Sequence, residues 1–101
     1  MKTFKDIEFK PCNNIQGVRG QIEINGQVVS VISGMLTHGS KIDSSLVSDH
    51  LSFELAIWES NDPSKWTTKN WVRGAIGIQC PIKEGMNRRQ INRLLKKIQL
   101  N

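Results

Sequence analysis

The dipeptide Asn25-Gly26 constrains the fold of this chain more than any other feature of its sequence. It lies between two segments rich in β-branched residues, Val18–Ile24 and Gln27–Ser33. Asparagine followed by glycine readily adopts the two positive φ angles of a type I′ turn, which joins antiparallel strands through a two-residue loop. That turn sets the register of the hairpin, so the expected opposite pairs are Ile24 and Gln27, Ile22 and Val29, and Gly20 and Val31.

The hairpin has one apolar and one polar side, because successive residues of a strand point to opposite faces. The apolar side carries Val18, Ile22, Ile24, Val29 and Val31. The other side carries Arg19, Gln21, Glu23 and Ser30, with Val28 and Ile32 as apolar exceptions. This alternation is typical of an antiparallel sheet that is buried on one face.

Three more strands are predicted. Leu51–Trp58 places Leu51, Phe53, Leu55 and Ile57 on one side, and Trp71–Gln79 places Val72, Ile76 and Ile78 on one side. Pro81 is expected to end the second of these, and Pro11 is expected to end a short strand at Lys5–Lys10, because proline cannot donate to a strand ladder. Residues 34–50 and 60–69 are predicted as polar loops, and a helical turn near Ser44–Ser48 remains open.

A C-terminal helix is predicted from Asn87 onward. Asn87 and Gln90 have the spacing of a capping box, and Ile91, Leu94, Leu95 and Ile98 recur at helical spacing. The predicted fold class is therefore α+β, an antiparallel four- to five-stranded sheet with a C-terminal amphipathic helix packed on one face. An apolar fraction of 38% and a charged fraction of 23% indicate a globular chain, and 101 residues suit one compact domain, 1–101.

The positive charge of the chain is concentrated at its C-terminal end. Residues 83–101 hold six basic residues and one acid, whereas residues 1–82 hold eight of each, so the whole net charge of +5 comes from the last segment. On the predicted helix, Arg89, Arg93, Lys96 and Lys97 fall opposite the apolar stripe, with Arg88 near the boundary. A concentrated positive field favours an anionic partner.

Arg88 and Arg89 would lie in the first helical turn, where the helix dipole disfavours cations by about 0.3–1 kcal/mol each. Together with the free amides of that turn they would suit a phosphate or a carboxylate. The alternative is an ordinary solvated helix whose basic residues serve solubility.

Two strands share the pattern V-R-G-x-I-x-I, at Val18–Ile24 and Val72–Ile78. Each places its arginine, Arg19 or Arg73, on the polar side of the strand. The two arginines would flank an anionic ligand if the strands lie in one sheet, or the similarity arises by chance.

Three tryptophans, Trp58, Trp66 and Trp71, lie among lysines within fourteen residues. Such rings stack nucleic-acid bases, anchor protein interfaces or close the core beneath a loop. Trp58 is expected on the polar face of its strand, near Val28 and Ile32, where an apolar patch would suit a homodimer.

The sequence holds no arrangement typical of a catalytic site, a metal site or a cofactor site. His38 and His50 lie in a predicted loop, and with Cys12 or Cys80 they lack the spacing of a zinc site or a Cys–His dyad. The cysteines are expected to be free thiols, and no signal peptide or membrane span is expected, so the predicted location is the cytoplasm.

The segments around Asn25-Gly26 and Phe53–Ile57, followed by a lysine- and arginine-rich helix, make the chain similar to small accessory proteins encoded by bacteriophages. The resemblance lies in the general make-up of a short single-domain chain, and no functional residue transfers from it. It implies a phage or mobile-element protein, a class that often binds nucleic acid or disables a host component.

The main hypothesis is a non-enzymatic binding module that recognises nucleic acid, a phosphorylated ligand or an acidic protein through Arg88, Arg89, Arg93, Lys96 and Lys97. The alternative is an inhibitor of a host factor that acts through the exposed sheet face and Trp58. A small hydrolase or transferase that uses His38 or His50 is a third hypothesis.

Overall fold

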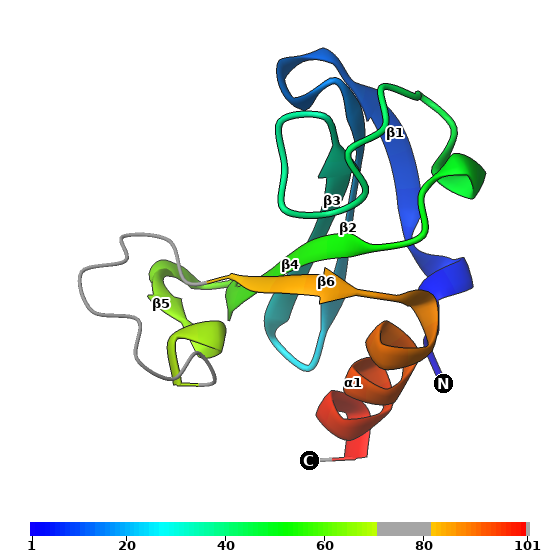
Figure 1. Cartoon of the computed structure of the whole chain (residues 1–101). Helices are drawn as coiled ribbons and strands as arrows, with labels where there is room; N and C mark the ends of the chain where they lie inside the picture. Colours follow the sequence, from blue (N-terminus) through cyan, green and yellow to red (C-terminus); the bar gives the residue numbers. More distant parts are fainter. Residues whose placement is uncertain (71–81, 101) are drawn as a thin grey trace.

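A computed structural model of the chain, shown in Figure 1, describes residues 1–70 and 82–100. These residues form an antiparallel sheet with one C-terminal α-helix against it, so the predicted α+β fold is confirmed. The strands and the helix are β1 Glu8–Cys12, β2 Gly17–Ile24, β3 Gln27–Gly34, β4 Phe53–Glu59, β5 Asp62–Trp66, β6 Lys83–Met86 and α1 Arg88–Leu100. The same residues contain the 3-10 helices η1 Phe4–Asp6, η2 Asn13–Ile15, η3 Val47–Asp49 and η4 Thr67–Asn70.

The turn between β2 and β3 has the geometry that the sequence predicts. Asn25 and Gly26 have φ angles of 50° and 73°, and Ile24 pairs with Gln27, Ile22 with Val29 and Gly20 with Val31. The Asn25 side chain also donates a hydrogen bond of 3.1 Å to the carbonyl oxygen of Ile98. The tight turn therefore contacts the last turn of α1 as well as setting the strand register.

The sheet is a meander in the order β1-β2-β3-β4-β5, with β6 paired to β4. The first strand begins later than predicted, at Glu8, because residues 4–6 form η1. Pro11 does not end this strand: it lies within β1 and is aligned with Val18 of β2. β1 is an edge strand, where a residue without an N–H is tolerated.

The start of β4 also differs from the prediction. Leu51 is 73% exposed, and β4 begins at Phe53. The backbone N–H groups of Leu51 and Ser52 both donate to the Ser40 hydroxyl at 2.8 Å, so a loop contact replaces strand pairing there.

Two short strands were not predicted. β5 contains Asp62-Pro63-Ser64, a composition typical of turns, yet it pairs with β4 through Trp66 and Trp58 at the edge of the sheet. β6 pairs Met86 with Phe53, although Lys83–Met86 shows no alternation of apolar and polar residues. The described residues therefore form six strands, because pairing with β4 stabilises segments whose own strand propensity is weak.

α1 closes the core on one face of the sheet. Asn87 Oδ1 accepts from the Gln90 N–H at 2.8 Å and Gln90 Oε1 accepts from the Asn87 N–H at 2.9 Å, which confirms the predicted capping box. The inner stripe of α1 is buried and Leu94 is half-buried at its border. The buried core consists of Phe4, Ile7, Ile24, Val29, Val31, Phe53, Leu55, Ile57, Ile91, Leu95 and Ile98.

The predicted strand Trp71–Gln79 lies outside the described residues, as do Arg73, Trp71, Cys80 and Pro81.

A buried polar network attaches the long segment between β3 and β4 to the sheet. Ser33 and His50 are fully buried, and the Ser33 hydroxyl lies 2.8 Å from His50 Nδ1. Ser33 Oγ also accepts from the Ser40 N–H at 3.0 Å, and His50 Nε2 lies 3.0 Å from the Ser44 carbonyl oxygen. These hydrogen bonds connect both ends and the middle of the segment. The segment also contains η3, which His50 follows directly and which overlaps the helical turn that the sequence left open.

Candidate functional site

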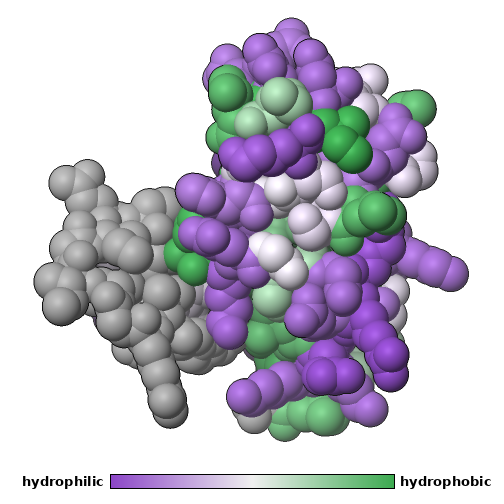
Figure 2. All heavy atoms as spheres, in the orientation of Figure 1, coloured by the Kyte–Doolittle hydropathy of each residue, from purple (hydrophilic) through white to green (hydrophobic). Residues whose placement is uncertain are grey.

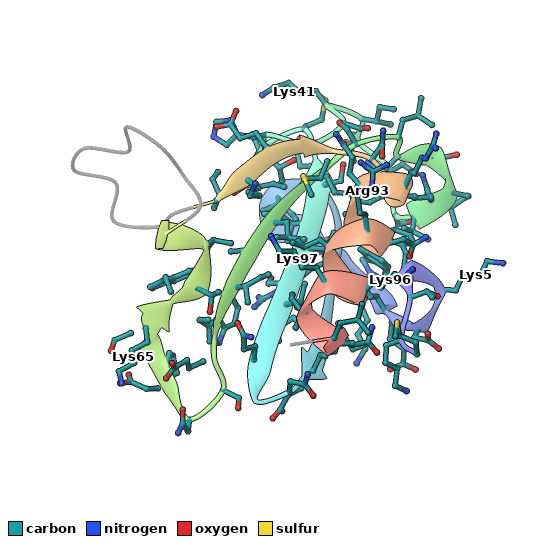
Figure 3. The ribbon with its side chains drawn as sticks, turned by 90° about the horizontal axis from the view of Figure 1, so that it is seen from below. Lys5, Lys41, Lys65, Arg93, Lys96 and Lys97 are labelled. Atoms are coloured by element: carbon teal, nitrogen blue, oxygen red, sulfur yellow. The ribbon has the colours of Figure 1, made fainter. Side chains whose placement is uncertain are left out.

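Four cationic side chains project from the solvent-facing side of α1: Arg89, Arg93, Lys96 and Lys97. All four are exposed, and Figure 3 shows Arg93, Lys96 and Lys97 along the helix. Among the residues that the structure describes, no aspartate or glutamate forms an ion pair with any of them. Since α1 itself contains no acid, its positive charge is not neutralised locally.

Arg88 differs from the expectation, because its side chain turns inward. Its guanidinium donates to the carbonyl oxygens of His50 and Val47 at 2.6 and 2.8 Å. It also lies over the rings of Phe4 and Phe53, with Cζ 5.2 and 5.3 Å from the ring centroids. Arg88 therefore connects α1 to the 34–52 segment. The predicted anion site of Arg88 and Arg89 in the first helical turn is wrong for Arg88.

The N-terminal segment adds two cations that the sequence did not connect with the helix. Gln99 accepts from the Lys2 N–H at 2.6 Å and donates to the Lys2 carbonyl oxygen at 2.8 Å, and Asn92 accepts from the Phe4 N–H at 2.7 Å. These contacts hold residues 2–4 beside α1. Lys2 and Lys5 are exposed there, and Figure 3 shows Lys5 on the same side of α1 as Lys96.

We call the exposed residues Lys2, Lys5, Arg89, Arg93, Lys96 and Lys97 the basic surface. The carboxylate of Asp6 lies at its border, near the charge of Lys2. The hydrogen bond from the Thr3 backbone N–H, at 2.8 Å, lowers the pKa of Asp6, and the charge of Lys2 lowers it further. Asp6 is therefore ionised at neutral pH and opposes only a small part of the positive charge.

A shallow groove of about 260 Å³ lies between β6 and α1. Its lining consists of Lys83, Met86, Gln90, Arg93, Leu94 and Lys97. Met86 and Leu94 are half-buried, whereas Arg93 and Lys97 are exposed members of the basic surface. Figure 2 shows hydrophobic atoms at the surface where β6 meets α1, with hydrophilic atoms around them. We call this feature the β6–α1 groove.

A second groove, of about 310 Å³, lies on the opposite face of the sheet. Its lining includes Arg19, Ile32, Trp58 and Trp66, and the centroids of the two tryptophan rings are 5.2 Å apart. Trp58 is aligned with Val28 and Arg19 with Ile32, so the predicted exceptions on the polar face do lie beside these residues. We call this feature the outer groove.

The structure thus does not bring Arg19 and Trp58 together with the basic surface, because the sheet separates them. Cys12, a half-buried free thiol, also lines the outer groove.

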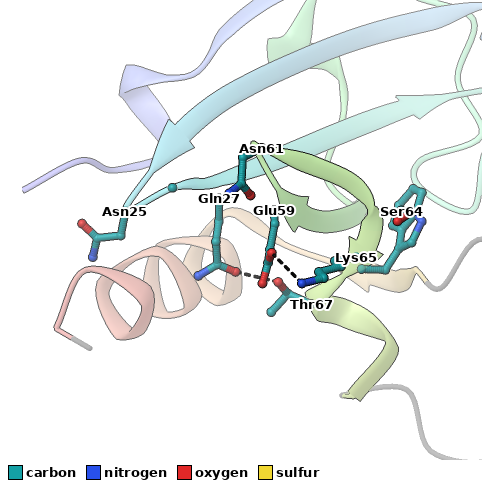
Figure 4. A pocket seen from close by; sticks show the side chains of 9 residues that line it. Asn25, Gln27, Glu59, Asn61, Ser64, Lys65 and Thr67 are labelled. Atoms are coloured by element: carbon teal, nitrogen blue, oxygen red, sulfur yellow. Dashed lines mark hydrogen bonds and ion pairs between the residues drawn. The ribbon is translucent and has the colours of Figure 1, made fainter.

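A larger open hollow of about 830 Å³ lies at the end of the sheet near the Asn25-Gly26 turn. Figure 4 shows its polar lining, in which Thr67 donates to Gln27 at 2.7 Å and Lys65 pairs with Glu59 at 3.9 Å. Since the carboxylate of Glu59 balances the charge of Lys65, this hollow does not extend the basic surface.

The two histidines lie in different surroundings. His38 is exposed, and its Nδ1 lies 3.7 Å from Glu84. His50 is fully buried and contacts the backbone carbonyl of Ser44 rather than its hydroxyl, while that hydroxyl donates to Asp49. The structure therefore does not bring Ser44, Asp49 and His50 into the order of a hydrolytic triad. A buried His50 instead fits the structural network with Ser33.

In the described part of the chain, His, Cys, Asp and Glu side chains do not gather in groups of three or more that could hold a metal ion. Nor does any helix there have the length and apolar character needed to cross a membrane.

Comparisons of the chain with known protein families, with curated proteins and with solved structures found no match.

Proposed function

We propose that this chain is a non-enzymatic binding module that recognises an anionic target through the basic surface. The observation that carries the proposal is the set of four exposed α1 cations that have no ion-pair partner among the described residues. A surface helix that serves solubility commonly interleaves acids and bases, because Glu and Lys one turn apart stabilise it. α1 has basic residues and no acidic residue on this side, and Lys2 and Lys5 add two further positive charges beside it.

The target classes that fit this surface are nucleic acid, a phosphorylated ligand and an acidic protein segment. Each would gain Coulomb attraction that falls with salt, because the side chains involved are exposed. The cytoplasm is the expected location, since that is where free thiols such as Cys12 persist.

Charge reversal on α1 tests the proposal. The doubly substituted variant Arg93→Glu/Lys96→Glu should bind a labelled DNA oligonucleotide or labelled poly-glutamate about tenfold more weakly, because about 1.4 kcal/mol of attraction is lost. Fluorescence anisotropy at several salt concentrations measures the effect. For DNA, a plot of the logarithm of affinity against the logarithm of salt should have a slope of several units.

The matched control is Lys10→Glu/Lys41→Glu, which reverses two exposed cations outside the basic surface. Its net charge equals that of the α1 variant, and we expect it to retain most of the wild-type affinity. Equal loss in the two variants would mean that overall charge, rather than this surface, governs binding. No binding of either polyanion at low salt would overturn the proposal.

The outer groove supports a second candidate function, inhibition of a host protein through the sheet face. Trp58 and Trp66 form an aromatic pair there, and tryptophan is common among residues that dominate protein interfaces. If this candidate is right, Trp58→Ala abolishes recovery of the partner from a nuclease-treated bacterial lysate, while Arg93→Glu/Lys96→Glu leaves it unchanged. The opposite pattern would exclude it.

A further inference from the structure

We infer that the target of the basic surface is an acidic protein segment that inserts one large apolar side chain into the β6–α1 groove. This inference rests on the proposed function and specifies the chemistry of the partner. It starts from the position of Arg93 and Lys97, which belong to the basic surface and also form part of the groove lining. An anion bound by these two residues is therefore held beside the half-buried side chains of Met86 and Leu94.

The composition of the groove matches the anatomy of a protein-binding site. Such sites have an apolar centre that excludes water and a polar or charged rim. Here Met86 and Leu94 form the apolar part, while Arg93, Lys97 and Gln90 are exposed around it. Methionine adapts its shape to different side chains, which suits it to the floor of such a groove.

The size of the groove favours a side chain over a small molecule. Its volume of about 260 Å³ is below the range of roughly 300–1,000 Å³ that is typical of small-molecule sites. A volume of this size suits one leucine, isoleucine, methionine or phenylalanine side chain of a bound segment. The charges at the rim then select carboxylates on either side of that side chain.

The surroundings also favour a protein over single-stranded nucleic acid. Proteins that bind single strands use aromatic rings on which the bases stack. Among the described residues, no aromatic ring lines the β6–α1 groove. Trp58 and Trp66 line the outer groove instead, and Phe4 and Phe53 are buried in the core.

Selection from a displayed library of random twelve-residue peptides, with the wild-type protein as bait, tests the inference. Enriched peptides should combine several acidic residues with one large apolar residue. The most enriched peptide is then synthesised with a fluorescent label, and its affinity is measured by anisotropy. Replacement of its apolar residue with serine should weaken binding about tenfold, which corresponds to about 1.4 kcal/mol.

Variants of the groove identify where the peptide binds. Met86→Gln keeps the length of the side chain and Leu94→Gln lengthens it by one atom, and both remove its apolar character. Each should weaken binding of the acidic apolar peptide about tenfold while leaving poly-glutamate binding unchanged. If Leu94→Gln does not fold, Met86→Gln alone carries the test. The matched control is Ile32→Gln in the outer groove, which should bind the peptide as the wild type does.

The outcomes separate this inference from the proposed function. Acidic peptides enriched with no apolar preference, or equal binding by wild type, Met86→Gln and Leu94→Gln, would overturn the inference and leave the proposed function standing. Preferential binding of DNA at the basic surface would do the same. Absence of binding to peptides, poly-glutamate and DNA alike would overturn both.

Discussion

Replacement of Arg88 with alanine is expected to lower the free energy of unfolding by about 3–4 kcal/mol. Hydrogen bonds to a charged group contribute about 1.5–3 kcal/mol each, and the guanidinium makes two of them as well as contacts with two phenylalanine rings. The variant also leaves the carbonyl oxygens of Val47 and His50 without this donor. Urea denaturation followed by tryptophan fluorescence measures the change.

The neighbouring residue provides the control. Arg89 is exposed and without an ion-pair partner among the described residues, so Arg89→Ala should change stability by no more than about 0.5 kcal/mol. Arg88→Lys should recover less than half of the loss, because an ammonium lacks the planar fork that reaches two carbonyl oxygens. Equal stability of Arg88→Ala and Arg89→Ala would show that Arg88 has no such structural role.

Replacement of Gly17 with alanine is expected to destabilise the protein by about 3 kcal/mol or more, because overpacking against a rigid backbone forces strands apart. Gly17 of β2 is aligned with Gly34 of β3. A Cβ atom at Gly17 would overlap the carbonyl oxygen of Ser33 and lie 2.5 Å from the Cα atom of Gly34. Both are backbone atoms, so no side-chain rotation relieves the clash. Thermal and urea denaturation measure the loss.

Gly85→Ala provides the comparison. At φ 62° Gly85 has a left-handed conformation, but apart from its own chain neighbours no described atom lies within 4 Å of the position that a Cβ would occupy. Its replacement should cost about 1–2 kcal/mol from backbone strain alone. An equal loss of the free energy of unfolding in Gly17→Ala and Gly85→Ala would contradict the close approach of β2 and β3 at this end of the sheet.

The features that local pattern determines were predictable from the sequence. The type I′ turn at Asn25-Gly26, the register that follows from it and the capping box of α1 each depend on residues a few positions apart. The apolar sides of β3 and β4 followed from their alternation. These elements are enough to define the α+β class.

The features that depend on distant contacts were missed. β6 has no strand pattern of its own. Lys2 and Phe4 are hydrogen-bonded to Gln99 and Asn92, ninety or so residues away in the chain, and these bonds bring the N-terminal segment to α1. No local signal connects them. The β6–α1 groove could therefore not be predicted from the sequence either.

Two buried contacts that were not predicted had a local signal in the sequence. Arg88 was placed near the boundary of the apolar stripe, and it precedes Ile91 by three residues, so its side chain can reach inward beside that stripe. Ser33 continues the series Val29 and Val31 on the inner face of β3. A hydroxyl at such a position needs a buried partner, and His50 provides it.

The meander order of the strands has a consequence for folding of the chain during its synthesis on the ribosome. Each strand from β2 to β5 pairs with the strand before it in the sequence, so successive hairpins can form while translation continues. Val29, Leu55 and Ile57 are covered only when α1, which follows all of these strands in the sequence, has been synthesised. Nascent chains should therefore expose the apolar face of the sheet for a time. During that time, chaperone binding and aggregation compete with completion of the native state.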